Sequence, residues 1–240
     1  MLTTTNAIVL SKIKYRDNDL IVKCYTQKYG LVSYLLRNVS SSKKGNSKSA
    51  YFQLLSQLQL VTLHKNNRSL QEVKEVKVHY LYSNLQTHVI KSAITFFLAE
   101  LLTSTLKEEE SNEHLYTYLE TTLQWLDTHN HYANFHLLFL LKLTKHLGFY
   151  PELPQNNESW FNLAEGTFQH HKTNMYAVSG ENIILLKHLL GINFDKLNTI
   201  KINSNQRQSF LKMMLLYFEL HLEGFRKPQS MEIFNQVFNS

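Results

Sequence analysis

The residues best suited to binding chemistry gather in one stretch, RNVSSSKKGNSKSAY at residues 37–51. It contains four cations (Arg37, Lys43, Lys44 and Lys48), five serines and no acid. Lysine and arginine neutralise phosphates, and serine hydroxyls and backbone N–H groups contact them without reading a base sequence. This composition favours a cationic loop that closes on a polyanion. The alternative is a solvated linker, because Ser, Gly and Asn weaken local order.

The distribution of charge along the chain points the same way. The net charge is +6, but residues 1–80 contain 13 Lys and Arg against 4 Asp and Glu, a balance of +9. Residues 81–240 contain 12 against 15, a balance of −3. Basicity confined to the first third predicts a polyanionic partner there, although charge that serves only solubility is the simpler alternative.

Catalytic chemistry finds little support in the sequence. No P-loop, G-x-G-x-x-G, G-x-S-x-G or H-E-x-x-H motif is present. Asp17 and Asp19 are the only close pair of acids near the basic stretch, and a polar turn explains them. Cys24 alternates with Val22 in a strand pattern, which predicts a buried, inert thiol. We therefore expect no enzyme and no catalytic residue.

Twelve histidines raise the question of a metal site. His129, His131 and His136 cluster at a helix junction, and His170 and His171 are adjacent. Neither group has a Cys or a carboxylate at ligand spacing. The sequence therefore predicts no metal and no cofactor. The single cysteine excludes an internal disulfide and fits a reducing, cytoplasmic setting.

The elements that carry the basic residues are strands. Apolar residues alternate with polar ones in five segments, broken by polar turns and by the basic stretch. The segments cover residues 6–15, 19–30, 31–38, 51–65 and 70–80. A five-stranded antiparallel barrel with one long connection after its third strand is the layout of an OB-fold, whose face and loops commonly hold single-stranded nucleic acid.

From Ser83 the apolar period becomes helical. Gly148 with Pro151 just beyond indicates a helix end. The fold class is therefore α+β in two domains, an OB-fold at residues 1–80 and an all-α domain at 81–240, with an irregular segment at 150–180. No stretch reaches the ~20 apolar residues of a membrane span, and the N-terminus lacks the features of a signal peptide. We expect a cytoplasmic protein without membrane contact.

Four tyrosines of the basic third offer rings on which bases could stack: Tyr25, Tyr29, Tyr34 and Tyr51. Because strand side chains alternate, about half of them must face the core. Without a register the sequence does not say which.

Three segments together resemble one family. They are AIVLSKIKYRDNDLIV at residues 7–22 with YTQKYG at 25–30, LKLTKHLGFYP at 141–151, and LHLEGFRKPQSMEIF at 220–234. In this order they resemble RecO, a family of bacterial recombination mediators, over nearly the whole chain. The resemblance implies a non-catalytic protein that binds single- and double-stranded DNA and anneals complementary strands. It also implies that the protein acts with RecR to load RecA onto DNA coated by single-stranded-DNA-binding protein, whose acidic C-terminal tail it recognises.

The resemblance assigns two sets of residues. The DNA role falls on the cations of the barrel: Arg16, Arg37, Lys43, Lys44 and Lys48, with Lys65 and Arg68 as weaker candidates. The tail-binding role falls on an apolar groove of the helical domain, rimmed by Lys142 and Lys145 or by Arg226 and Lys227. For both sets the alternative is an ordinary solvated surface.

One departure from the family is clear. Many members carry a four-cysteine zinc module where this chain has residues 150–180, which contain no cysteine. Zinc is not expected, and packing of Trp160, Phe161, Phe168 and Tyr176 must hold the segment instead. A rival function also stays open: a scaffold whose helical domain binds protein partners and whose basic barrel is incidental.

Overall fold

The structure is a computed structural model that describes residues 2–16, 18–37, 39, 48–65, 67–107, 110–155 and 157–239. The chain divides into two compact units. The first comprises the residues up to Thr128 together with Pro228–Ser230, and the second comprises His129–Lys227 with the residues from Met231 onward. Residues 81–128 thus pack with the barrel, so the compact units group the chain differently from the expected domains 1–80 and 81–240.

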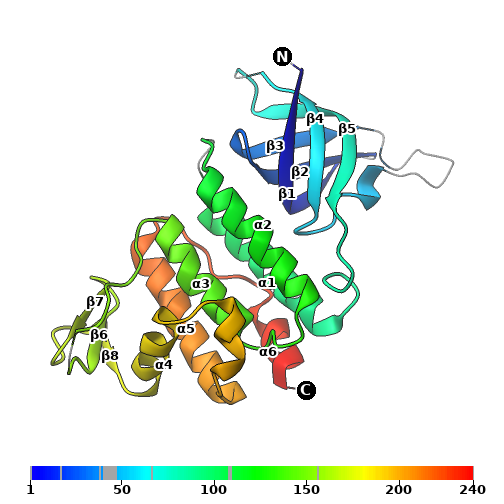
Figure 1. The fold of residues 1–240 in the computed structure, drawn as a ribbon. Coiled ribbons are helices and arrows are strands. Elements are labelled where there is room, and N and C mark those ends of the chain that lie inside the picture. Colours follow the sequence, from blue (N-terminus) through cyan, green and yellow to red (C-terminus); the bar gives the residue numbers. More distant parts are fainter. Residues whose placement is uncertain are drawn as a thin grey trace. The chain divides into compact units, whose positions relative to one another are not determined.

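Five strands of the first unit close into a barrel (Figure 1). They are β1 Leu2–Tyr15, β2 Asp19–Thr26, β3 Gly30–Leu36, β4 Gln57–Leu63 and β5 Leu70–Tyr80. Their order is β1-β2-β3-β5-β4, with β4 pairing back onto β1. Strands β3 and β5 run parallel, and the other neighbours are antiparallel. This arrangement confirms the predicted five-stranded OB-type barrel.

Alternating side chains fill the barrel. Val22 and Cys24 of β2 and Val32, Tyr34 and Leu36 of β3 are buried together, as the two-residue period of a strand requires. Burial raises the pKa of the Cys24 thiol, so the side chain stays protonated and packs as a small apolar group.

The fourth strand begins later than the sequence predicts. The prediction starts it at Tyr51, whereas β4 begins at Gln57. Phe52 and Leu55 are both fully buried although they lie three positions apart, which strand alternation does not allow. Leu55 also has φ of 58°, in the left-handed region, and this interrupts the extended run. Residues 51–56 therefore form a packed loop before the strand.

Two helices complete the first unit, α1 Val89–Thr105 and α2 Glu113–Thr128. The second unit contains α3 Phe135–His146, α4 Glu181–Leu190, α5 Ser204–His221 and α6 Met231–Asn239. Gly148, with φ of 85°, ends the α3 segment in the left-handed conformation that the sequence predicts. None of the helices in the described part of the chain has the length and apolar content that crossing a bilayer requires.

The segment at residues 150–180 contains a small sheet that the sequence did not reveal. Its strands are β6 Trp160–Asn162, β7 Thr167–Gln169 and β8 Ala177–Ser179, in the order β7-β6-β8. Strands of three residues are too short to show alternation. Of the four aromatics expected to hold this segment, Phe161 and Phe168 are buried with ring centroids 4.8 Å apart, and Trp160 and Tyr176 are half-buried.

Candidate nucleic-acid interface

The register of the β1–β2 hairpin places two lysines on one side of the sheet. Lys12 lies opposite Val22, and Lys14 lies opposite Leu20. Residues that oppose each other across an antiparallel pair share a face, and Val22 belongs to the barrel core. The lysines therefore occupy the core-facing side of β1, at the point where the hairpin extends past the buried part of the barrel.

A bulge in β1 produces this placement. The pairing of β1 with β2 shifts between Val9 and Ser11, so that one extra residue stands on β1. An extra residue in one strand reverses the faces of all residues beyond it. Val9 is buried before the bulge, and after it the even-numbered Lys12 and Lys14 take the inner side.

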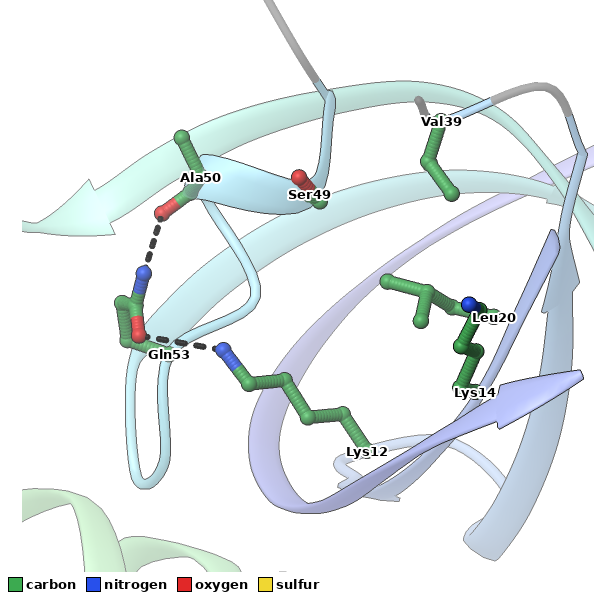
Figure 2. Close-up of a pocket in the computed structure, with 7 residues that line it drawn as sticks. All are labelled: Lys12, Lys14, Leu20, Val39, Ser49, Ala50 and Gln53. Carbon is green, nitrogen blue, oxygen red and sulfur yellow. Dashed lines mark hydrogen bonds between the residues drawn. The ribbon is translucent and has the colours of Figure 1, made fainter. Parts of the chain in front are cut away.

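These lysines line a cavity of about 410 Å³ in the first unit. Leu20 and Val39 form apolar parts of its lining, and a short 3₁₀ turn, η1 Lys48–Ala50, borders it across from β1. Figure 2 shows Lys12 reaching from the β1 ribbon toward Gln53, and Lys14 on the same ribbon beside Leu20. No acid is among the described residues that line the cavity, which are Lys12, Lys14, Leu20, Val39, Ser49, Ala50 and Gln53.

A chain of two hydrogen bonds spans one side of the cavity (Figure 2). Lys12 Nζ donates to Gln53 Oε1 at 3.2 Å, and Gln53 Nε2 donates to the Ala50 carbonyl oxygen at 3.4 Å. The amide is thus oriented with its oxygen toward the cation. An ammonium group has three donors, so two N–H groups of Lys12 remain for an anion in the cavity.

Main-chain hydrogen bonds fix the walls of the cavity. The N–H of Val39 donates to the carbonyl of Asn18 at 2.8 Å, which ties Val39, three residues beyond the end of β3, to the turn of the β1–β2 hairpin. The N–H of Leu55 donates to Val9 at 2.7 Å, which ties the loop after η1 to β1. The lysines therefore face a preformed surface.

Arg16 lies exposed at the tip of the β1–β2 hairpin, with its guanidinium carbon 5.2 Å from the centre of the Tyr15 ring. Its φ is 56°, a conformation that glycine or asparagine adopts at lower cost. A long cationic side chain at such a position is a candidate for a functional role, because backbone strain persists where another requirement outweighs it.

A second cationic group gathers beside β3 and β5. Their parallel pairing places Leu35 next to Glu72. Lys74 lies 3.0 Å from the Glu72 carboxylate. The pKa of Glu72 is lowered first by this lysine and then, through longer-range attraction, by Arg37 and Arg68. Two of the predicted DNA-binding residues, Arg37 and Arg68, thus act on the same carboxylate.

Gln71 holds the loop between β4 and β5 in shape. Its side chain is buried; its Oε1 accepts from the Lys65 N–H at 2.9 Å, and its Nε2 donates to the carbonyls of Lys65 and Arg68 at 2.8 and 2.7 Å. The Lys65 and Arg68 side chains remain exposed. A single buried amide therefore makes this loop a fixed platform for two cations.

The remaining predicted DNA-binding residues are Lys43, Lys44 and Lys48. Lys48 begins the η1 turn. Lys43 and Lys44 lie outside the described residues. The cationic loop predicted to close on a polyanion, residues 37–51, therefore stays a prediction. Of its described residues, Arg37 borders the surface beside β3 and β5, and η1 borders the cavity beside β1.

The structure separates the tyrosines that the sequence left unassigned. Tyr34 belongs to the barrel core. Tyr25 is also buried, but it follows the core residue Cys24 on β2 and so lies on the opposite face of the strand. Tyr29 is half-buried and stacks on His64 with ring centroids 4.0 Å apart. Tyr51, which follows the cavity-lining Ala50 in sequence, is exposed. Tyr15 on the hairpin is exposed as well and was not among the four tyrosines singled out from the sequence.

Sequence reasoning also missed Lys12 and Lys14. The segment SKIKY does show two cations at strand spacing, which places them on one face. Whether that face is the core-facing one depends on the bulge between Val9 and Ser11, and no residue pattern in the sequence predicts this bulge.

The predicted tail-binding residues lie in the second unit. Lys142 is half-buried; its Nζ donates to the Tyr150 hydroxyl at 3.3 Å and to the Leu190 carbonyl at 3.5 Å, and burial lowers its pKa. Lys227 forms an ion pair with Glu219 at 2.7 Å. Lys145 and Arg226 are exposed.

The histidines do not assemble with other ligands. Among the described residues no group of three or more His, Cys, Asp or Glu side chains has a geometry that could hold a metal ion. His136 is buried against the rings of Phe234 and Phe238, whose centroids lie 4.8 and 5.3 Å away. His129, His131, His170 and His171 are exposed.

Comparison with known families covers both halves of the chain. Residues 1–82 match the family model described as recombination protein O, N-terminal, and residues 86–230 match the one described as recombination protein O, C-terminal. The chain belongs to the RecO family. The RecO match spans the barrel, its cationic surfaces and most of the helical region.

Individual relatives agree with this assignment. The DNA repair protein RecO of Christiangramia forsetii is 49% identical over 99% of this chain and 100% of the relative. The DNA repair protein RecO of Flavobacterium psychrophilum is 43% identical over 98% of both chains. The protein of the same name from Flavobacterium johnsoniae is 42% identical, also over 98% of both.

Proposed function

We propose that this RecO-family protein is a non-catalytic DNA repair mediator of the cytoplasm. Its barrel binds single- and double-stranded DNA without sequence preference and promotes annealing of complementary strands. The observation that supports this most is the cavity beside β1, where Lys12 and Lys14 face a wall of polar and apolar groups and no described lining residue is an acid.

The physical basis is neutralisation of phosphates. Each lysine or arginine that pairs with a phosphate releases a condensed counterion, and this contribution does not depend on the bases. Cations stand on both sides of the long connection after β3: Lys12, Lys14 and Arg16 on the hairpin, and Arg37, Lys65 and Arg68 toward β5. A strand that follows these groups would meet positive charge along its backbone.

Annealing follows from the same charges. Two DNA strands repel each other through their phosphates, and this repulsion slows pairing. A barrel with a balance of +9 over residues 1–80 lowers the repulsion while one strand is held and another approaches. Because the contacts are to phosphates, the base edges stay available for pairing.

The partners follow from the family. We propose that the protein acts with RecR to load RecA onto DNA coated by single-stranded-DNA-binding protein, and that the helical region recognises the acidic tail of the coating protein. Lys145 and Arg226 are exposed, whereas Lys142 is half-buried, so Lys145 and Arg226 are the first residues to test for the tail.

The decisive experiment is a fluorescence anisotropy titration of a non-specific oligonucleotide at several salt concentrations. We expect binding at micromolar concentration or tighter. With about four phosphates neutralised on a single strand, log K should fall against log salt with a slope near −3. Lys12→Gln combined with Lys14→Gln should lower the affinity and flatten the slope by about 1.4.

A matched control uses lysines on the same barrel. Lys74→Gln with Lys77→Gln removes the same charge from β5, where Lys74 already pairs with Glu72, and should change the affinity less. Absence of binding at low salt would instead support the rival function, a protein scaffold with an incidental basic barrel.

A further inference from the structure

The cavity beside β1 has features that a surface for phosphates alone does not need. Two lysines supply positive charge, but Leu20, Val39 and Ala50 supply apolar surface beside them. Val39 is buried, and its main chain is fixed by the bond to Asn18. A ligand complementary to this lining carries negative charge at one end and a flat, weakly polar body at the other.

We propose that this cavity binds one unpaired nucleotide of a DNA strand, with its phosphate between Lys12 and Lys14 and its base against Leu20 and Val39. The inference rests on the proposed function and names the part of the substrate that the cavity takes. It predicts that the protein recognises unpaired nucleotides, at strand ends or gaps, in addition to the backbone.

The size of the cavity agrees with a ligand of this class. Its volume of about 410 Å³ falls at the lower end of the roughly 300–1,000 Å³ that small-molecule sites occupy. A base within a duplex is stacked and paired, so it must leave the helix before it can enter such a space. An unpaired nucleotide enters without that cost.

The positions of the cations suit a phosphate group. Lys12 and Lys14 are two residues apart on one face of β1, which places their Cα atoms about 6–7 Å apart. Their flexible stems can converge on one phosphate from two sides. Figure 2 shows both side chains at the border of the cavity, with Lys12 oriented by Gln53.

The polar groups opposite the lysines supply the remaining contacts. The Ser49 and Gln53 side chains both line the cavity. A hydroxyl donates and accepts, and a side-chain amide has two donors and two acceptor sites. Such groups can hydrogen-bond the sugar, which is the same in every nucleotide, so the site accepts a nucleotide without strong preference for its base.

The test is an NMR titration of the full-length protein with three probes: thymidine 5′-monophosphate, thymidine and inorganic phosphate. We expect the nucleotide to produce saturable shifts of the amide signals of Leu20, Val39 and Ser49. Thymidine and phosphate should each bind at least tenfold more weakly, because each reaches only one part of the site. Equal shifts with phosphate and with the nucleotide would overturn the proposal.

Two variants separate the parts of the site. Lys12→Gln with Lys14→Gln should abolish nucleotide binding, and the β5 pair Lys74→Gln with Lys77→Gln should leave it unchanged. Ala50→Trp places a large side chain at the border of the cavity from an exposed position and removes no charge. It should weaken nucleotide binding at least tenfold while oligonucleotide affinity falls less than threefold.

The outcomes distinguish this inference from the proposed function. If oligonucleotides bind in a salt-dependent way but the nucleotide does not shift the cavity signals, the inference fails and the proposed function stands. If the nucleotide binds and oligonucleotides do not, DNA mediation is refuted. A duplex with a one-nucleotide overhang should also bind more tightly than a blunt duplex, and equal affinity counts against the cavity proposal.

Discussion

Lys91 of α1 donates a 2.7 Å hydrogen bond from its Nζ to the main-chain oxygen of Asp127, near the end of α2. Both side chains are almost completely buried. The Asp127 carboxylate in turn accepts the N–H groups of Ser83, Asn84 and Leu85 at 2.9, 2.7 and 2.8 Å. One acidic residue therefore joins the segment after the barrel to both helices of the first unit.

Removing this carboxylate should destabilise the first unit strongly. Asp127→Ala leaves buried N–H groups without their acceptor and the Lys91 ammonium without the nearby negative charge. We expect the free energy of unfolding in urea to fall by about 3–5 kcal/mol. Asp127→Asn keeps one acceptor oxygen and should lose roughly half as much. Thr117→Ala, at an exposed position of α2, should change stability by less than about 0.5 kcal/mol.

Much of the fold follows from local patterns in the sequence. The barrel strands were predictable because β-branched and aromatic residues recur along them at two-residue spacing, and in β3 the burial alternates in the same way. Gly148 marked a helix end because its left-handed φ favours glycine. The sheet β6-β7-β8 was not predictable, because three-residue strands show no period. The predicted start of β4 at Tyr51 was wrong, because Phe52 and Leu55 are buried as parts of a packed loop and not as alternating residues of a strand.

The candidate site was less accessible to sequence reasoning. Charge alone identified the basic barrel, since composition does not depend on conformation. The selection of Lys12 and Lys14 depends on the bulge after Val9, which only the register reveals. In the same way, Lys142 looked available because its partners, Tyr150 and the carbonyl of Leu190, are brought to it by tertiary packing.

Stability should also depend on the protonation of one histidine. Burial against aromatic rings, with the Arg207 charge as a second cause, lowers the pKa of His136 to about 3. In the unfolded chain the pKa is about 6.5. The unfolded state therefore binds the proton first, and stability falls as the pH drops below about 6.5, by up to about 1.4 kcal/mol per pH unit until the folded pKa is reached.

Urea unfolding at pH 7.5, 5.5 and 4.5 measures this dependence. His136→Leu removes the titrating ring and should reduce the loss of stability between pH 7.5 and 4.5 by about 2.7 kcal/mol relative to the parent protein. In an NMR titration the His136 ring signals should stay those of the neutral form at pH 5. If the ring titrates near 6.5, the explanation by burial is wrong.

Gly166 occupies a position where any side chain should be costly. Its φ is 73°, and a Cβ atom there would lie 2.8 Å from the Tyr217 hydroxyl oxygen. That hydroxyl donates to the carbonyl of Phe149 at 2.7 Å, so it is not free to move away. We expect Gly166→Ala to lower the free energy of unfolding by about 2–4 kcal/mol, from backbone strain together with the steric contact.

Gly148 provides the matched control for the steric part. Its φ is 85°, but a Cβ atom there would meet nothing within 4 Å. Gly148→Ala should therefore cost only the backbone strain, about 1–2 kcal/mol. Tyr217→Phe should cost less in the Gly166→Ala protein than in the parent, because removing the hydroxyl also relieves the contact. Equal costs of the two glycine substitutions would exclude the contact as a cause.

Arg16 allows function and stability to be separated at one residue. Glycine adopts its φ of 56° without strain, which offsets the loss of the Tyr15 contact and the greater freedom of glycine in the unfolded chain. Arg16→Gly should therefore keep the free energy of unfolding within about 0.5 kcal/mol of the parent value. If the hairpin tip contacts DNA, affinity should fall and the salt slope should flatten by about 0.7 on single strands. Anisotropy at low salt should compare Arg16→Gly with the variant that combines Lys12→Gln and Lys14→Gln. If Arg16→Gly binds DNA as tightly as the parent protein and the lysine variant binds more weakly, Arg16 is not part of the interface and the cavity lysines are.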